Sequence, residues 1–318
     1  MKIAIMGTGA MACLFGSRMI RSGHEVWMVS GWKEQVETIQ KNGLVLREKE
    51  HEDVMLHPHV TLHAEDVVAD GAAYPDLVMI SSKGYQTRRT VTNALPIIGP
   101  ETCVLTLQNG MGNADIIAEF VPAERVFFGA ASIAADAPAL GVVCDTTNRN
   151  RSPLISITPF TRQDSPFCKT LGDLFTSMGY STDASVAAVK FVWKKLCLNS
   201  CGNALAGITQ LSNHIYANDQ DGFIVINHIC AECCAVANAE GIALDYDELR
   251  AFVQATYYNQ HHYVSMCQDI HNKRPTEIDT INGIIVREGR KFGIPTPVNE
   301  TMAHLVHMIS NHYADQWV

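Results

Sequence analysis

The 318-residue chain is short of positive charge, with 24 lysines and arginines against 33 aspartates and glutamates and a formal net charge of −9. A protein that binds nucleic acid needs a basic surface that replaces the counterions of the phosphate backbone. The charge balance therefore argues against a nucleic-acid partner. The chain also lacks an apolar run long enough to cross a bilayer, and no cationic leader precedes its first apolar stretch. We accordingly expect a cytoplasmic protein with no membrane partner.

A paired-cysteine metal motif is lacking as well. Among the 10 cysteines, Cys230, Cys233 and Cys234 lie close together in a stretch with helical apolar spacing, but no second cluster completes a four-ligand site. The histidines are scattered, without the pair typical of metalloproteases. We interpret these cysteines as small apolar side chains in a helix interface, and we predict reduced thiols and no metal.

What the chain does contain is a nucleotide-binding signal at its start. Residues 1–6 are an apolar strand, a glycine turn follows, and a helix-like run extends to Arg21. The first glycine of such a turn permits the tight bend, and the second lets the backbone approach a pyrophosphate at the helix N-terminus. This context favours dinucleotide binding over an ordinary strand-turn-helix corner. The predicted cofactor contacts are Gly7, Thr8, Gly9, Ala10, Met11 and Ala12.

Length and pattern together predict two domains. Strand-like and helix-like stretches alternate through the first half, which is typical of a Rossmann-type doubly wound α/β sheet. Short β-like runs at 141–144 and 154–157 predict an antiparallel addition to that sheet. The predicted main strands are 1–6, 25–30, 76–82, 103–108 and 126–129.

Beyond these runs the pattern becomes helical throughout. We therefore expect a Rossmann domain over residues 1–185 and an all-helical domain over residues 186–318, with the ligand in a cleft between them. The predicted helices of the second domain are 186–208, 223–240, 247–266, 276–292 and 299–312.

The end of the second strand bears on the choice of nicotinamide cofactor. NAD-preferring Rossmann folds usually place an acidic residue there, on the ribose 2′-hydroxyl. Here the strand ends at Ser30, and no acid follows until Glu34. Ser30 can hydrogen-bond a 2′-phosphate and Lys33 can neutralise it, which favours NADP and leaves NAD possible. The alternative for Lys33 is a solvated residue in the first turn of the next helix.

One predicted helix of the second domain carries a polar stripe. Lys195, Asn199 and Asn203 are four residues apart and so lie on one helical face, among apolar neighbours. A lysine there can protonate a carbonyl oxygen while hydride arrives, and asparagines can hold hydroxyl or carboxylate groups. The alternatives are a solvent-facing stripe or a contact with the first domain.

Further segments resemble those of one family in order and approximate spacing. They are 82–86 and 109–112, each directly after a predicted strand, the helix at 193–203, and 276–279. With the N-terminal turn, they resemble the ketopantoate reductase (2-dehydropantoate 2-reductase) family over nearly the whole chain. The resemblance implies reduction of 2-dehydropantoate to (R)-pantoate with NADPH, a step towards pantothenate and coenzyme A.

The resemblance also implies roles for individual residues. Lys195 matches the general acid that protonates the keto oxygen, and Glu277 matches a glutamate near that lysine and the cofactor ribose. Lys83 and Asn109 match residues that contact the cofactor, with Asn109 also near substrate, and Ala135 would lie by the nicotinamide. Without the family pattern, Glu277 would be interpreted as a capping or surface residue. The matched substrate-binding residues are Asn199, Asn203, Asn213 and Ser265.

One departure from the family pattern keeps other functions open. The arginine with which the family selects NADP after the second strand is absent, and Ser30-Gly31-Trp32 occupies the region. Relatives with this architecture also reduce other bulky 2-keto acids to D-2-hydroxy acids, sometimes with NAD. A D-2-hydroxyacid dehydrogenase is therefore the alternative, and a non-catalytic nucleotide-sensing protein is an alternative of another class. The apolar surface expected of the helical domain suggests a homodimer.

Overall fold

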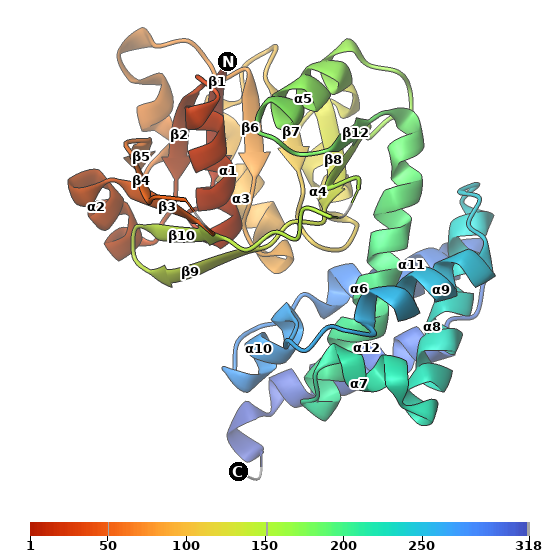
Figure 1. The fold of residues 1–318 in the computed structure, drawn as a ribbon. Coiled ribbons are helices and arrows are strands. Elements are labelled where there is room, and N and C mark those ends of the chain that lie inside the picture. Colours follow the sequence, from red (N-terminus) through yellow and green to blue (C-terminus); the bar gives the residue numbers. More distant parts are fainter. Residues whose placement is uncertain (50, 151, 317–318) are drawn as a thin grey trace. The chain divides into compact units, whose positions relative to one another are not determined.

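The computed structural model describes residues 1–49, 51–150 and 152–316, and the chain divides into two compact units (Figure 1). The division lies between Val189 and Lys190, four residues later than the predicted boundary between 185 and 186. The short segment Asn109–Gly112 also groups with the helical unit, because its contacts lie there. Unit 1 is thus Met1–Gln108 and Asn113–Val189, and unit 2 is Asn109–Gly112 and the chain from Lys190 onward.

Unit 1 is built on an eight-stranded sheet in the order β12-β11-β8-β7-β6-β1-β2-β5. The six strands from β5 to β8 in that list are parallel, and their order is the doubly wound order 3-2-1-4-5-6. This confirms the predicted Rossmann-type sheet. The strands are β1 Lys2–Met6, β2 Glu25–Val29, β5 His59–Thr61, β6 Leu77–Ile80, β7 Cys103–Thr106, β8 Val126–Ala131, β11 Ile155–Pro159 and β12 Thr182–Ala184.

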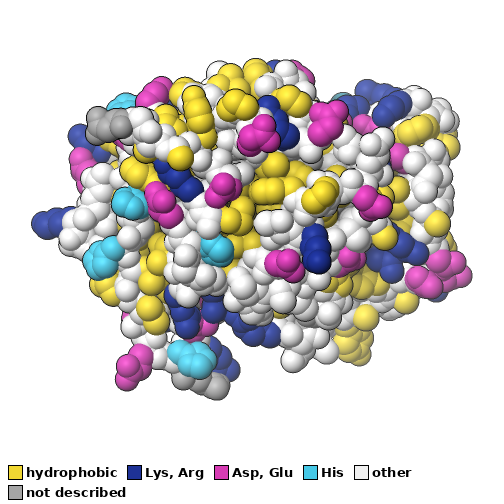
Figure 2. Space-filling view, turned by 90° about the horizontal axis from the view of Figure 1, so that it is seen from above, with side chains coloured by type: hydrophobic (Ala, Val, Ile, Leu, Met, Phe, Trp, Pro, Cys, Tyr) yellow, Lys and Arg dark blue, Asp and Glu magenta, His cyan; other side chains and the backbone are white. Residues whose placement is uncertain are grey.

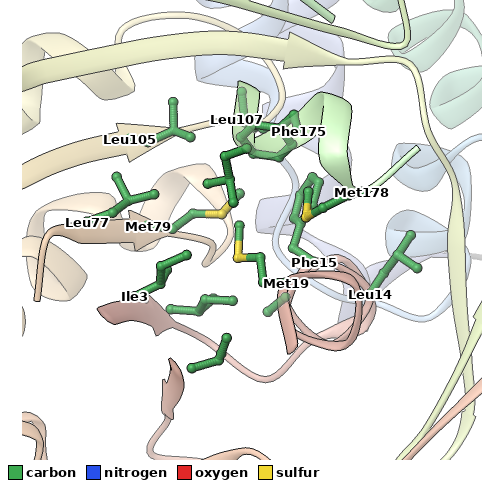
Figure 3. Packing of buried hydrophobic residues seen from close by; sticks show 14 of the residues in the cluster. Ile3, Leu14, Phe15, Met19, Leu77, Met79, Leu105, Leu107, Phe175 and Met178 are labelled. Atoms are coloured by element: carbon green, nitrogen blue, oxygen red, sulfur yellow. The ribbon is translucent and has the colours of Figure 1, made fainter. Parts of the chain in front are cut away.

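Helices connect these strands and bury their apolar faces against the sheet. Figure 3 shows Phe15 and Met19 of the first helix lying among Met79 of β6, Leu105 of β7 and Phe175. Phe15 and Phe175 meet edge to face, with ring centroids 5.6 Å apart. The helices are α1 Ala10–Arg21, α2 Lys33–Asn42, α3 Thr87–Ala94, α4 Asn113–Ala118 and α5 Pro166–Ser177, and the 3₁₀ turns are η1 Ala64–Gly71, η2 Gly84–Gln86, η3 Leu95–Ile97, η4 Ala123–Arg125 and η5 Val186–Ala188.

Unit 1 also contains a second sheet, which the sequence pattern did not predict. Its four strands have the order β4-β3-β10-β9, and β3, β9 and β10 pack against α1. The predicted antiparallel addition to the main sheet is therefore correct for β11, which pairs antiparallel with β8, and wrong for 141–144, which forms β10. β10 pairs in parallel with β3, where Val143 and Leu46 are both buried. The strands are β3 Leu44–Glu48, β4 Val54–Leu56, β9 Ala135–Ala139 and β10 Val142–Asp145.

Unit 2 is helical in its described residues, as predicted. The predicted helix 247–266 is wrong in extent, because it ends at Tyr257 and a separate helix begins at Ser265. The backbone between them is held in a loop, since the carbonyl of Gln260 accepts a hydrogen bond from the N–H of His214. The helices are α6 Val189–Thr209, α7 Asn213–Asn218, α8 Gln220–Ala239, α9 Tyr246–Tyr257, α10 Ser265–His271, α11 Ile278–Phe292 and α12 Pro297–Asn311, with η6 Tyr313–Asp315 after them.

One helix qualifies the expectation that no segment is apolar enough for a membrane. Among the described residues, α8 alone is long and apolar enough to cross a bilayer by length and composition. This is weak evidence for a membrane, because core helices of globular proteins satisfy the same criterion. Several of the apolar side chains of α8, including Ile226, Ile229 and Val236, are buried within unit 2.

A buried ion-pair cluster fastens the second sheet of unit 1 to α1. The guanidinium of Arg18 donates hydrogen bonds to Glu48 at the end of β3, 2.6 Å away, and to Asp145 at the end of β10. Burial by itself would raise the pKa of the Asp145 carboxyl. Hydrogen bonds from Thr147 and Arg18 outweigh burial, so the pKa lies below its usual range. Folding and ionisation of Asp145 therefore support each other.

We predict that Asp145→Asn lowers the free energy of unfolding at pH 7 by about 2 kcal/mol, less than the ~3–5 kcal/mol typical of a broken buried pair, because Glu48 still faces Arg18. Asp145 contributes its stability fully above its unfolded pKa of about 3.9, and the contribution is lost as the pH falls through the lower folded pKa. Urea unfolding should therefore show the wild-type advantage shrinking below pH 4. An advantage that is unchanged at pH 3 would contradict this account.

Candidate functional site

The turn after β1 is a glycine turn for steric reasons. Gly7 has φ of +144°, and a Cβ there would lie 2.9 Å from the carbonyl oxygen of Ser81, just after β6. Its N–H donates to the carbonyls of Ile5 (3.1 Å) and Val29 (2.8 Å), which ties the turn to β1 and β2. β1 and β6 are the strands at which the sheet order reverses, and open α/β sheets bind ligands outside the carboxyl ends of such strands.

The N-terminus of α1 can receive an anion. Gly9 is the N-cap residue and no side chain caps the helix, while a Cβ built on Gly9 meets no described heavy atom within 4 Å. Thr8 is buried, and its Oγ1 has no hydrogen-bond partner among the described residues. Unsatisfied N–H groups, open space and an unpaired hydroxyl fit a pyrophosphate held by residues 7–12. This turn is therefore suited to hold the phosphates of a dinucleotide.

The end of β2 presents hydroxyl and amine groups near its turn. The Oγ of Ser30 accepts a hydrogen bond from the backbone N–H of Trp32 (3.2 Å), which leaves the hydroxyl hydrogen to donate elsewhere. Lys33 begins α2, is largely exposed, and its Nζ lies 3.6 Å from the carboxylate of Glu37. The structure thus places Lys33 in a solvated helix turn, with an acidic partner on its own helix.

Lys83 and Ala135 occupy different parts of unit 1. Lys83 precedes η2, directly beyond the carboxyl end of β6. The side-chain amide nitrogen of Gln108 donates to the carbonyl of Ser82 (2.7 Å) and so joins the ends of β6 and β7. Gln108 was not among the predicted site residues. Ala135, predicted to lie by the nicotinamide, begins β9 in the second sheet and pairs with Asp145.

In unit 2, α6 places the catalytic candidate Lys195 against the segment Asn109–Gly112. The Nζ of Lys195 donates to the Oδ1 of Asn109 over 3.4 Å, although 85 residues separate them in the chain. The predicted polar stripe is present on α6: Lys195 and Asn199 are partly buried, and Asn203 is buried. The structure therefore brings together a lysine and an amide that were predicted from separate motifs.

The segment Asn109–Gly112 docks on the start of α11 through its backbone. The N–H of Met111 donates to the carbonyl of Thr280 (2.8 Å). Gly110 has φ of +81°, and a Cβ there would lie 2.0 Å from that same carbonyl oxygen. Glu277 is the buried N-cap residue of α11, three residues before Thr280. Thr280 was not among the predicted site residues, because its contribution is a backbone carbonyl that no sequence motif reports.

A second polar group joins α6 to α10. The Oδ1 of Asn203 accepts hydrogen bonds from the Oγ of Ser265 and from the N–H of Met266, both 3.3 Å away. Its Nδ2 donates to the carbonyl of Asn199, 3.1 Å away. Asn203 thus caps the N-terminus of α10 and positions Ser265 beside the polar stripe. Three of the predicted substrate-binding residues are neighbours here.

Asn213 forms a separate polar contact at the start of α7. It is fully buried, and its Nδ2 donates to the side-chain carbonyl of Gln260 (3.2 Å). Its Oδ1 has no hydrogen-bond partner in the part of the chain that the structure describes. No described contact joins Asn213 to Lys195 or Ser265, so its predicted role in binding substrate rests on the family resemblance.

A buried hydrogen-bond network that was not predicted from the sequence connects α6 to other helices of unit 2. The carboxylate of Glu232 accepts hydrogen bonds from the N–H groups of Val298 and Asn299 at the start of α12. The side chain of Asn299 in turn accepts from Asn282, whose Nδ2 also donates to the carbonyl of Ser200 on α6 (3.1 Å). Three helices, α8, α11 and α12, are thereby linked to the backbone of α6 between Asn199 and Asn203.

These two units define a class of protein. The doubly wound sheet with its uncapped glycine turn and the lysine-amide cluster are the elements of a nicotinamide-dependent oxidoreductase. The sequence matches the description "Ketopantoate reductase PanE/ApbA" over residues 3–150 and "Ketopantoate reductase PanE/ApbA C terminal" over residues 189–310. The chain belongs to the ketopantoate reductase family.

Individual relatives agree with this membership. A 2-dehydropantoate 2-reductase of Streptococcus pyogenes serotype M6 is 30% identical over 311 residues, with 96% of this chain and 97% of the relative covered. That of Lactococcus lactis subsp. lactis is 29% identical over 313 residues, with the same coverage. Each is a protein that this chain resembles over nearly its full length.

Solved structures give the same fold under two names. A D-mandelate dehydrogenase in a ternary complex with NADH and anilino(oxo)acetate has a TM-score of 0.89 at 30% identity, covering 99% of this chain and 100% of that one. A PanE/ApbA family ketopantoate reductase from Ralstonia eutropha JMP134 has a TM-score of 0.86 at 29% identity, covering 98% and 99%. This chain is thus similar in fold both to a D-mandelate dehydrogenase and to a ketopantoate reductase.

We predict that Gly110→Ala dislodges the segment Asn109–Gly112 from α11. Gly23→Ala is a matched control, because Gly23 has a similar φ of +83° but open space around a Cβ. Backbone strain of about 1–2 kcal/mol is common to both variants, and only Gly110→Ala adds a clash with a backbone carbonyl. Chemical unfolding should therefore show a larger loss of stability for Gly110→Ala. Equal losses would contradict the tight docking described above.

Proposed function

We propose that this protein reduces 2-dehydropantoate to (R)-pantoate with NADPH, as a cytoplasmic enzyme of pantothenate and coenzyme A biosynthesis. The observation that carries the proposal is the contact of Lys195 with Asn109 in a chain of the ketopantoate reductase family. The same unit holds Glu277 at the start of α11 and the Asn203–Ser265 pair. Relatives named 2-dehydropantoate 2-reductase cover nearly the whole chain, which supports this substrate.

The cofactor would be held by unit 1. The N–H groups at the start of α1 and the hydroxyl of Thr8 would bind its pyrophosphate, and the backbone at Gly9 leaves room for it. When bound, a reduced nicotinamide supplies hydride to the keto carbon of the substrate. The absence of a carboxylate at the end of β2, with Ser30 and Lys33 in its place, supports NADP over NAD.

The proton would come from Lys195. As hydride adds to the keto carbon, negative charge develops on the keto oxygen, and the ammonium of Lys195 stabilises that charge and transfers a proton to it. The product is the 2-hydroxy acid, and the lysine is left neutral until solvent reprotonates it. Asn109 would orient the Nζ of Lys195, because its Oδ1 already accepts a hydrogen bond from that nitrogen. Glu277 is proposed to act beside this lysine and the cofactor ribose.

The substrate would be oriented by the amide and hydroxyl groups of α6, α7 and α10. Asn199 and Ser265 offer donors to the substrate carboxylate or hydroxyl, and Asn203 holds Ser265 in place. Asn213 has a buried Oδ1 that a substrate hydroxyl can satisfy. These residues suit any 2-keto acid with a polar side group.

A second candidate is a D-2-hydroxyacid dehydrogenase for bulkier 2-keto acids. The specific observation that favours it is the TM-score of 0.89 to a D-mandelate dehydrogenase solved with NADH. The missing NADP-selecting arginine supports the same alternative, since it weakens the argument for NADPH. The lysine and amide groups described above would serve both substrates, because both share the keto-carboxylate group.

Two further proposals concern partners. The exposed apolar side chains of Leu211, Ile215 and Tyr258, at and near α7, support a homodimer formed through the helical unit. On the face seen in Figure 2, basic side chains are interspersed with acidic ones, which suits a small-molecule substrate better than nucleic acid.

We predict that Lys195→Ala lowers kcat with ketopantoate by about 10²–10⁴-fold, the range usual for loss of general acid catalysis. Cofactor affinity, measured by NADPH fluorescence titration, should be nearly unchanged. Lys194→Ala is the matched control, since Lys194 is the adjacent lysine of α6 and its Nζ lies 3.8 Å from Glu248. Turnover by Lys195→Ala that equals that of Lys194→Ala would remove Lys195 from the mechanism.

The substrate and cofactor are tested by oxidation of NADPH and NADH with ketopantoate, phenylpyruvate and benzoylformate. We expect the highest kcat/KM with NADPH and ketopantoate. A higher kcat/KM with an aryl keto acid, particularly with NADH, would identify a D-2-hydroxyacid dehydrogenase instead. Cofactor binding without turnover of any keto acid would support a nucleotide-sensing protein.

A further inference from the structure

Three cysteine thiols meet at the centre of unit 2. Cys197 and Cys201 are four residues apart on one face of α6, and Cys230 lies on α8. The Sγ of Cys230 lies 3.7 Å from that of Cys197 and 3.6 Å from that of Cys201, and all three sulfurs lie within 4.8 Å of one another. All three residues are fully buried. The cysteines at 230–234 were predicted to lie in a helix interface, but the pair on α6 that meets them was not predicted.

A fourth thiol lies nearby on α8. Cys233 is one turn beyond Cys230 and is fully buried, but its sulfur is not one of the three that lie within 4.8 Å of one another. Cys234 faces elsewhere, since its thiol donates to the carbonyl of Leu244 over 3.2 Å.

We propose that this α6–α8 thiol cluster (Cys197, Cys201 and Cys230) is a binding site for one thiophilic divalent cation such as Zn²⁺. Thiolates at the usual Zn–S distance of about 2.3 Å, placed at corners of a tetrahedron, would have their sulfurs about 3.8 Å apart. The two separations from Cys230, 3.7 Å and 3.6 Å, are close to that value. The helices therefore hold the sulfurs near metal-binding spacing without a change of fold.

Electrostatics decide which state of the cluster is stable. Burial raises the pKa of Cys197 to about 11 and raises that of Cys201 well above its ordinary value, so without metal these thiols stay protonated at pH 7. A divalent cation would displace those protons and form bonds to thiolates. Three thiolates with one such cation leave a charge of −1 in the core.

The compensating charge is present in Arg250 of α9. The pKa of Cys230 is raised by its hydrogen bond with Cys197 and by burial, and the positive charge of Arg250 acts in the opposite direction. The Nε of Arg250 is buried with no hydrogen-bond partner among the described residues. One terminal nitrogen lies 3.5 Å from the carboxylate of Asp247. Arg250 can therefore donate a hydrogen bond to a thiolate when the cluster has lost its protons. Neutral thiols do not require this interaction.

The experiment uses the full chain, fully reduced, with Cd²⁺ alone as the probe and ultraviolet thiolate-to-cadmium absorbance as the readout. Cd²⁺ is added to the native protein in one arm and is present during refolding from urea in the other, because the site is closed to solvent. We expect one equivalent to bind, with release of about three protons or more measured at constant pH. The double variant Cys201→Ala/Cys230→Ala should lose this band.

Cys103→Ala is the control, because Cys103 is a buried cysteine of β7 in unit 1 and should leave the band unchanged. Circular dichroism of each variant shows whether it has folded. If the double variant does not fold, Arg250→Gln provides the second test and should weaken Cd²⁺ binding by about tenfold or more. Absence of the band in both arms, or its retention in the folded double variant, would overturn the proposal. No readout uses enzymatic activity, so the outcome is independent of the proposed function.

Discussion

The candidate site depends on the close approach of one glycine to one carbonyl. Gly110 can lie against the oxygen of Thr280 only because it has no Cβ and adopts a positive φ. This approach allows the N–H of Met111 to bond to the same carbonyl, and it brings Asn109 within reach of Lys195.

The asparagines of α6 and α7 show how a polar site can be kept ordered before a ligand arrives. The side-chain Oδ1 of Asn203 caps α10 and its Nδ2 donates to the backbone of α6, so protein groups fix this side chain. Asn213 is fixed at its Nδ2 only, and its buried Oδ1 has no hydrogen-bond partner among the described residues. An unsatisfied buried acceptor is costly, and it gives a ligand with a matching donor an energetic advantage. Asn203 is therefore held by protein groups at both ends of its amide, whereas Asn213 is held at its nitrogen alone.

The fold was largely predictable because local patterns sufficed for it. The glycine turn after β1, the continuous apolar strands and the helical spacing beyond residue 186 each depend on neighbouring residues. The second sheet was missed because β3 and β10 are paired across about a hundred positions of sequence, and short partly buried strands carry no partner information. The helix predicted over 247–266 failed for a related reason, since Gln260 is held in a loop by His214.

The candidate site was predictable only in its side chains. Lys195, Asn199 and Asn203 were predicted from helical spacing, and residues 7–12, Ser30 and Lys33 from the glycine turn and the end of the second strand. The remaining site residues were predicted from the family resemblance. The groups that were not predicted are the carbonyl of Thr280 and the Glu232–Asn299–Asn282 network, which links α8, α11 and α12 to the carbonyl of Ser200 on α6. Such contacts are set by tertiary packing and have no signature in a single sequence.

The placement of Asn109–Gly112 makes unit 2 discontinuous in sequence, and this has a consequence for biogenesis. A fragment beginning at residue 190 would lack the group that bonds to Thr280, so the helical unit cannot be isolated whole by a single cut. The contact between Met111 and Thr280 spans about 170 positions, and contacts of such long range are costly to close early in folding. During synthesis from the N-terminus, unit 1 is nearly complete well before residue 280 exists. The loop that aligns Lys195 must therefore remain undocked until almost the whole chain has been made.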